Sequence, residues 1–248
     1  MTAPLGRRVA AEAVGTGLLV AVVVGSGIQA AELSRDVGVQ LLANSLATVF
    51  GLGVLIAVLG PVSGAHFNPA VTLAAWFTGR HRADGLTLRD VAAYVPAQIA
   101  GAIGGAVLAD AMFAEPLVEW STHDRSDSHL WLGEVVATAG LILLIFGLER
   151  AGNASLAPVA VASYIGAAYW FTSSTSFANP AVTIGRALTD TFAGIAPASV
   201  APFIAAQLAG AVFGLGAVIA LYGPPAPAPA PAADAVVVPH GEPGPASS

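Results

Sequence analysis

Two copies of one pentapeptide stand out among the polar residues of the sequence. Residues 68–72 and 179–183 both have the sequence Asn-Pro-Ala-Val-Thr. Asparagine is a favourable N-cap and proline is favourable at the first helical position, so each copy predicts the start of a helix. The apolar residues that follow, to about Phe77 and to about Leu188, are too few to cross a bilayer. Each copy therefore predicts a half-helix with a positive N-terminal end.

The rest of the chain has the composition of a membrane protein. Of its 248 residues, 56% are hydrophobic and only 10% are charged, whereas a soluble domain carries about a quarter charged residues. The formal net charge of -6 and the lack of a basic run argue against nucleic acid as a partner. The chain has no cysteine, and its histidines and carboxylates do not cluster at ligand spacing, so we expect no metal site and no cofactor.

The two halves of the chain repeat the same order of features. Glu12 in the first half corresponds to Glu134 in the second, and Gln98 corresponds to Gln207. Each half contains three apolar spans and one half-helix, and an odd number of spans means that the second half enters the membrane from the opposite side. This pattern predicts an inverted repeat, about 9–113 and 131–222, with its functional site near the midplane. The six predicted spans are about 9–31, 38–60, 89–113, 131–149, 154–172 and 198–222.

Paired Asn-Pro-Ala motifs in the two halves of such a chain resemble those of the aquaporin and aquaglyceroporin family of membrane channels. The resemblance implies an all-α membrane fold with six transmembrane helices and two re-entrant half-helices, formed by residues 1–222. It also implies a homotetramer in which each chain holds a complete pore. Residues 223–248 are rich in proline and alanine, and we expect them to form a disordered tail.

The resemblance assigns the two motifs to the centre of a pore. In the family the two re-entrant loops meet there, and the asparagine amides direct their N–H donors at the permeating molecule. The converging half-helix ends oppose cations and protons. The motif residues that carry over to this centre are Asn68, Pro69, Ala70, Asn179, Pro180 and Ala181.

Three further titratable residues are candidates for a role beside the motifs. His66 matches a histidine that the family has on the cytoplasmic half of the pore. Glu12 and Glu134 lie within spans, where an unpaired carboxylate is costly. We expect each carboxylate to accept hydrogen bonds from backbone N–H groups of a non-helical loop. The alternative is a proton-coupled secondary transporter that uses both glutamates.

The residue after the second motif is Val182, where most aquaporins have an arginine. Counting from the asparagines, the other filter positions fall at Thr48, Ala167 and Ser176. All four side chains are small and uncharged, which predicts a wide entrance without arginine. Arg186 lies one turn beyond Val182, about 6 Å further along the half-helix. We expect Arg186 to extend to water as an interfacial anchor.

An entrance of this kind suits uncharged polyhydroxy solutes. Valine after the second motif resembles bacterial aquaporins associated with arsenic resistance, and arsenous acid at neutral pH is an uncharged triol. We therefore predict a passive channel for arsenite, methylarsenicals, glycerol-like molecules and water. A general glycerol, urea and water facilitator and a water-selective aquaporin are the alternatives. No nucleophile–base pair or phosphate loop suggests an enzyme.

The positions of the arginines predict the orientation. If the N-terminus is cytoplasmic, most basic residues fall on the cytoplasmic side, as the positive-inside rule requires. We therefore expect a multi-pass protein of a bacterial inner (plasma) membrane, in contact with lipid and with both termini in the cytoplasm. The cytoplasmic arginines would be Arg7, Arg8, Arg80, Arg82, Arg89 and Arg150, and the others are Arg35, Arg125 and Arg186.

Overall fold

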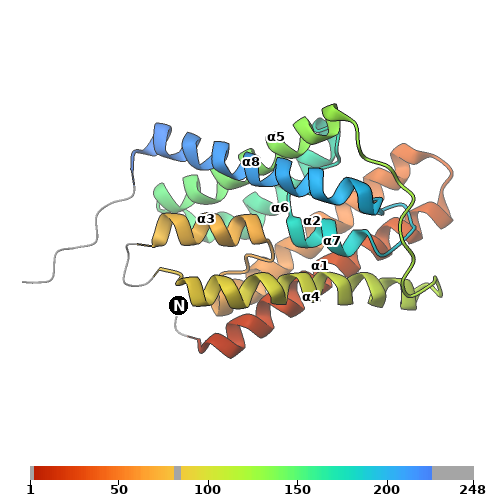
Figure 1. Cartoon of the computed structure of the whole chain (residues 1–248), viewed down its shortest axis with the longest axis horizontal. Coiled ribbons are helices and arrows are strands. Elements are labelled where there is room, and N and C mark those ends of the chain that lie inside the picture. Colours follow the sequence, from red (N-terminus) through yellow and green to blue (C-terminus); the bar gives the residue numbers. More distant parts are fainter. Residues whose placement is uncertain (1–2, 81–84, 225–248) are drawn as a thin grey trace, which may run out of the picture.

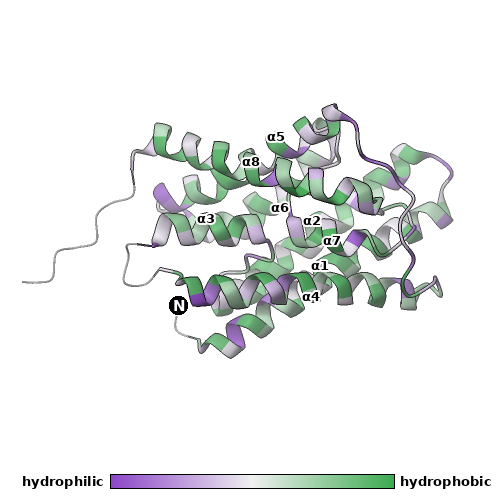
Figure 2. Cartoon of the chain, in the orientation of Figure 1, coloured by the Kyte–Doolittle hydropathy of each residue, from purple (hydrophilic) through white to green (hydrophobic). Residues whose placement is uncertain are grey.

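The structure is a computed structural model that describes residues 3–80 and 85–224. Within these residues every regular element is a helix, and six helical segments are long and apolar enough to cross a membrane. Figure 2 shows the apolar residues along these helices and the hydrophilic ones mostly in the connections. The predicted all-α fold is confirmed. The six segments are α1 (Leu5–Leu33), α2 (Val37–Ser63), α4 (Leu88–Met112), α5 (Ser128–Arg150), η1 with α6 (Ala154–Leu156 and Ala157–Phe171) and α8 (Pro197–Tyr222).

Two shorter helices begin at the repeated motifs, as predicted. They are α3 (Pro69–Gly79) and α7 (Pro180–Arg186), and their N-caps are Asn68 and Asn179. Each asparagine side chain accepts a hydrogen bond from the first free backbone N–H groups of its helix, which fixes the helix start. Figure 1 shows α3 and α7 end to end between α4 and α8. We call the side where α1 begins the N-terminal side and the side where α1 ends the far side.

The two halves pack in the same way, with α1 against α4 and α5 against α8. Glycine allows both contacts. A Cβ atom on Gly101 would collide with the backbone oxygen of Ala13, and one on Gly210 would collide with that of Val135. Close backbone approach through small residues is typical of helix pairs in lipid.

The outer surface of the bundle is apolar and part of its interior is polar. Large side chains such as Phe50, Val159 and Val212 are exposed, whereas Glu12 and Glu134 are fully buried. This arrangement suits a lipid surround and a polar site inside the bundle.

The predicted tail lies almost wholly outside the described residues, as does Arg82. Only its first two residues are described, and Arg150 Nη1 donates hydrogen bonds to the carbonyls of Gly223 (3.2 Å) and Pro224 (3.1 Å).

Candidate functional site: a cavity between two re-entrant loops

The loop before α3 is held by Glu12 of α1. The Glu12 carboxylate accepts hydrogen bonds from the backbone N–H groups of His66 (3.0 Å) and Phe67 (2.7 Å) and from Ser63 Oγ (2.6 Å). Ala65 and Phe67 have left-handed backbone conformations, with φ of 49° each. A backbone this irregular at membrane depth needs polar partners inside the protein, and Glu12 supplies them.

Glu134 of α5 holds the loop before α7 in the same manner. Its carboxylate accepts from the N–H groups of Phe177 and Ala178, both at 2.8 Å, and from Gln207 Nε2 at 2.6 Å. In the first half Gln98 Nε2 donates to Glu12 at 2.8 Å. The structure therefore gives both glutamates the loop-supporting contacts expected from the sequence.

These contacts also orient the loop carbonyls. In a trans peptide unit the N–H and C=O groups point in opposite directions. Because the N–H groups of the loops point at the glutamates, the carbonyls of the preceding residues point away from them. Those residues are Ala65 and His66 in the first loop and Ser176 and Phe177 in the second, and all four line one cavity.

The two asparagines meet at the centre of the structure. Asn68 Nδ2 donates to the carbonyl of Ala178 (2.7 Å), and Asn179 Nδ2 donates to that of Phe67 (2.8 Å). Each carboxamide has two N–H donors, so the crossing bond uses one and leaves one for the cavity. The expectation that both donors face a permeating molecule is thus corrected to one donor per asparagine.

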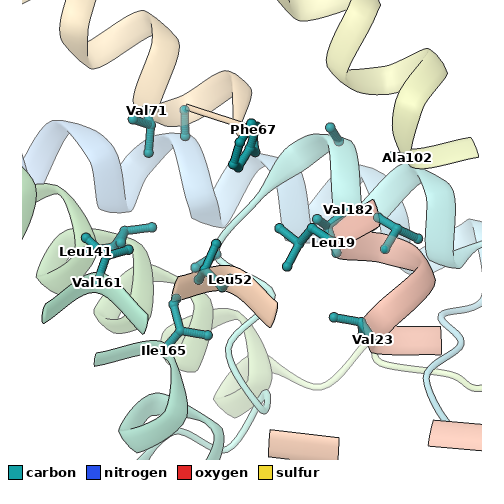
Figure 3. Packing of buried hydrophobic residues seen from close by; sticks show 14 of the residues in the cluster. Leu19, Val23, Leu52, Phe67, Val71, Ala102, Leu141, Val161, Ile165 and Val182 are labelled. Carbon is teal, nitrogen blue, oxygen red and sulfur yellow. The ribbon is translucent and has the colours of Figure 1, made fainter. Parts of the chain in front are cut away.

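The cavity has a volume of about 220 Å³ and is mainly apolar. Figure 3 shows buried aliphatic side chains from several helices, and most of those labelled also line the cavity. Its polar lining includes the loop residues and asparagines described above. The labelled apolar lining residues are Leu19, Val23, Leu52, Phe67, Val71, Leu141, Val161, Ile165 and Val182.

Three of the four predicted filter residues, Thr48, Ser176 and Val182, line this cavity and are buried. The fourth prediction is wrong, because Ala167 is exposed on the outer face of α6 and does not border the cavity. Tyr169, two residues later, lines the cavity, and its hydroxyl lies 3.2 Å from Thr48 Oγ1. Two residues turn an α-helix by about 200°. A shift of two positions in the predicted register therefore moves the assignment from Ala167, on the outer face of α6, to Tyr169, on the face that borders the cavity.

The prediction for Arg186 is also wrong. Its side chain is only 4% exposed, lines the cavity and donates from Nε to the carbonyl of Ala193. Its guanidinium carbon lies 3.4 Å from the centroid of the Phe177 ring. Helical side chains point toward the N-terminus of their helix, so the long Arg186 side chain can reach back past its own Cα position. The sequence alone gives no indication that the Phe177 ring contacts the Arg186 guanidinium.

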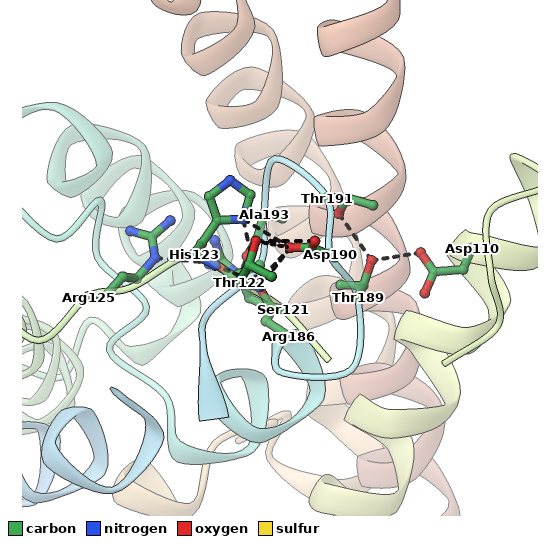
Figure 4. A network of polar contacts seen from close by, with 11 residues as sticks. Asp110, Ser121, Thr122, His123, Arg125, Arg186, Thr189, Asp190, Thr191 and Ala193 are labelled. Atoms are coloured by element: carbon green, nitrogen blue, oxygen red, sulfur yellow. Dashed lines mark hydrogen bonds and ion pairs between the residues drawn. The ribbon is translucent and has the colours of Figure 1, made fainter. Parts of the chain in front are cut away.

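Two connections cover the far side of α7. The segment 113–127 pairs with the segment 187–196, for example through the Glu119 N–H and the Leu188 carbonyl (2.9 Å). Figure 4 shows the polar network between them, in which Asp190 accepts from the Thr122 N–H at 2.8 Å. This backbone hydrogen bond holds the pKa of Asp190 below its usual range. The network fixes the segment whose carbonyl holds Arg186.

His66 lies in the half of the cavity on the N-terminal side. Its Nδ1 is 3.1 Å from Thr72 Oγ1, and its ring packs edge-on against Tyr94. Within residues 3–80 and 85–224, no group of three histidine or acidic side chains could hold a metal ion. His66 is one of the polar residues that line the cavity.

Comparison with known proteins identifies the family. Residues 1–177 match the family described as major intrinsic protein. The chain belongs to the major intrinsic protein family. It is 52% identical over 211 residues to aquaglyceroporin AqpS of Rhizobium meliloti, covering 85% of this chain and 88% of the relative. The chain is therefore a multi-pass membrane channel of the aquaglyceroporin type.

More distant relatives agree with this assignment. Aquaporin Z of Photorhabdus laumondii is 34% identical over 172 residues, covering 62% of this chain and 71% of the relative. Propanediol uptake facilitator PduF of Citrobacter freundii is 31% identical over 172 residues, covering 58% of this chain and 59% of the relative. The aquaglyceroporin structure from Plasmodium falciparum matches with a TM-score of 0.60 at 22% identity, covering 85% of this chain and 94% of that one, and supports the fold.

Proposed function

We propose that the protein is a passive channel for small uncharged polyhydroxy solutes, namely arsenite, methylarsenicals and glycerol-like molecules, as well as water. The observation that carries the proposal is the two-sided lining of the cavity. One part offers loop carbonyls and the asparagine amides, and the other part is aliphatic. A solute with hydroxyls on one side and CH or methyl groups on the other matches both parts.

The centre of the cavity favours uncharged solutes over cations. The N-terminal ends of α3 and α7 approach each other there, and each carries a positive partial charge. A cation at this point would lose hydration and meet a positive potential. Asn68 and Asn179 each offer one N–H donor to a passing oxygen atom.

Val182 supports passage of solutes larger than water. An arginine at this position would fill part of the cavity, and valine leaves that space open and apolar. Thr48 and Ser176, which also line the cavity, are small residues. The names of two relatives, an aquaglyceroporin and a propanediol uptake facilitator, are consistent with a pore for small polyols.

We further propose that the N-terminal side is cytoplasmic, in the inner membrane of a bacterium, and that four chains assemble as a homotetramer. The excess of arginine on the N-terminal side supports the orientation. Relatives from bacteria support the location. The exposed apolar faces of the bundle are available for lipid and for neighbouring chains.

A proton-coupled transporter that uses Glu12 and Glu134 is the alternative. The hydrogen bonds of both carboxylates argue against it, since each accepts from two backbone N–H groups and a glutamine amide. A proton on either carboxylate would compete with these donors. In the proposed channel, Glu12 and Glu134 therefore only hold the two loops.

Uptake by proteoliposomes, with an imposed pH gradient and without one, distinguishes these functions. We expect arsenite, methylarsenite, glycerol and urea to equilibrate to the external concentration in either condition, faster than in protein-free vesicles. Accumulation above the external concentration that an uncoupler abolishes would establish the transporter instead. Entry of water alone would contradict the proposed solute range.

A further inference from the structure

We infer that Arg186 provides the fixed positive charge of the far-side entrance, while Val182 sets the width of the passage there (the bore). The two properties are thus assigned to different residues, one helical turn apart. This inference deepens the proposed function, because it concerns how the same cavity selects uncharged solutes. Arg186 would repel cations and donate hydrogen bonds to the oxygen atoms of a neutral solute.

The environment of the Arg186 guanidinium carries the inference. Its one hydrogen bond within the described residues runs from Nε to the Ala193 carbonyl, and no described carboxylate forms an ion pair with it. Its two terminal nitrogens donate no hydrogen bond to a described residue, and Arg186 lines the cavity. A buried charge without a counter-charge is costly, and contact with a hydrated cavity lowers that cost.

The structure holds this guanidinium on a rigid support. The Phe177 ring lies 3.4 Å from it, a distance at which a cation and an aromatic face attract each other. Phe177 is itself fixed, because Glu134 accepts its N–H at 2.8 Å and Phe203 packs edge-on at 5.3 Å between ring centroids. Arg125 also contacts the ring, at 4.9 Å, and donates from Nε to the Gly194 carbonyl at 3.2 Å.

Neighbouring hydroxyls complete the polar part of this entrance. Thr48 donates its proton to the Asn44 carbonyl at 2.9 Å, so its oxygen can accept the proton of Tyr169. Ser176 Oγ is buried and has no hydrogen-bond partner among the described residues, although the residue lines the cavity. Because Ser176 Oγ is enclosed, we expect a solute oxygen at this level to meet the terminal nitrogens of Arg186 and not this hydroxyl.

The route of the Arg186 side chain explains how bore and charge are separated. An arginine at position 182 would supply charge and occupy the cavity at the same point. Arg186 instead lies against Phe177, so the guanidinium adds charge while the space beside Val182 stays open. Substitution of Val182 should therefore change size selection, and substitution of Arg186 should change charge selection.

The absence of cysteine from the chain allows a direct test of this charge. Val182→Cys introduces a single thiol, and its pKa is measured from the pH dependence of modification by methyl methanethiosulfonate, a small neutral reagent. A positive charge nearby favours the thiolate, so we expect this thiol pKa to be lower by about one unit than in Val182→Cys/Arg186→Gln. Arg35→Gln, at an exposed position in the α1–α2 connection, is the control and should leave the pKa unchanged.

A second measurement needs no change at Arg186. In Val182→Cys the anionic reagent sulfonatoethyl methanethiosulfonate should react about tenfold faster, relative to a cationic analogue, than it does with Ser155→Cys on the exposed η1 turn. Equal thiol pKa values with and without Arg186, or equal reagent preference at positions 182 and 155, would overturn the inference. Both readouts are independent of solute flux, so failure of the proposed solute range would leave them interpretable.

Discussion

The two re-entrant loops are built on the same support and differ at their outer ends. In each half a buried glutamate accepts two backbone N–H groups of the loop, and a glutamine links that glutamate to a threonine of the half-helix. In each half the asparagine also donates to a carbonyl of the other loop. The corresponding sets are Glu12, Gln98, Thr72 and Asn68 in the first half and Glu134, Gln207, Thr183 and Asn179 in the second.

The difference begins one turn from the centre. In the first half His66 lies beside Thr72, and α3 continues for 11 residues. In the second half α7 ends after 7 residues at Arg186, which folds onto Phe177. The repeat therefore builds a symmetric centre and duplicates Val182 as Val71, whereas the charge proposed for the far-side entrance depends on Arg186 and Phe177, which the repeat does not duplicate.

The largest expected effect comes from removing either glutamate. Glu12→Ala and Glu134→Ala each leave two buried loop N–H groups and a glutamine amide without their acceptor. Each lost partner costs about 1–3 kcal/mol, so both variants should lose several kcal/mol of stability. Thermal unfolding in detergent, followed by tryptophan fluorescence, should show similar losses in the two halves. A native melting temperature for one variant would show that the two supports are not equivalent.

The next largest effect concerns the symmetric centre. Aspartate still caps a helix, so Asn68→Asp and Asn179→Asp should fold, but each places a carboxylate where two positive helix ends meet. We expect proton or cation leak into proteoliposomes to rise about tenfold, corresponding to about 1.4 kcal/mol, and by a similar factor in both. A pH-sensitive dye inside the vesicles measures the leak. Leak through only one variant would refute a symmetric barrier.

A smaller effect should separate the two halves. Phe177→Leu removes the cation–aromatic contact with Arg186, so Arg186 should become less well positioned and the leak should rise about threefold. The matched variant His66→Leu, in the first half, should leave the leak near the native value because His66 holds no arginine. Equal leaks in the two variants would mean that Phe177 does not support the charge.

The smallest effect concerns the network beyond α7. The Thr122 N–H lowers the pKa of Asp190, so its ionised form adds stability above about pH 4, and this stability is lost as the pH falls through the lowered value. Asp190 is near the surface, so Asp190→Asn should cost under about 1 kcal/mol at pH 7 and less at pH 3. Melting temperatures at the two pH values check this. A loss of stability as large at pH 3 as at pH 7 would point to a steric cause.

Much of the fold could be predicted because it depends on local properties of the sequence. The lengths of the apolar spans and the caps at Asn68 and Asn179 are enough to predict six helices and two half-helices. The contacts of Glu12 and Glu134 followed from the cost of a carboxylate within a membrane span.

The predictions for Ala167 and Arg186 are wrong because they depend on the direction in which a side chain points from its helix. Ala167 and Tyr169 differ by two positions in one helix, and the sequence contained no marker for the face that borders the cavity. The position of its backbone predicts that Arg186 extends to water, whereas its side chain runs toward the start of α7 and contacts Phe177. Phe177 precedes the motif by two residues, and only the folded loop reveals that its ring supports an arginine.

The most direct test of the account is the ratio of glycerol to water permeability, measured by stopped-flow light scattering on proteoliposomes with the native chain and with Val182→Arg. The native chain should admit both glycerol and water. Val182→Arg should keep water permeability and lose glycerol permeability by about tenfold, since a second arginine would narrow the cavity. A native chain that passes water but no glycerol, or a ratio unchanged by Val182→Arg, would contradict the claim that the space beside Val182 sets the solute range.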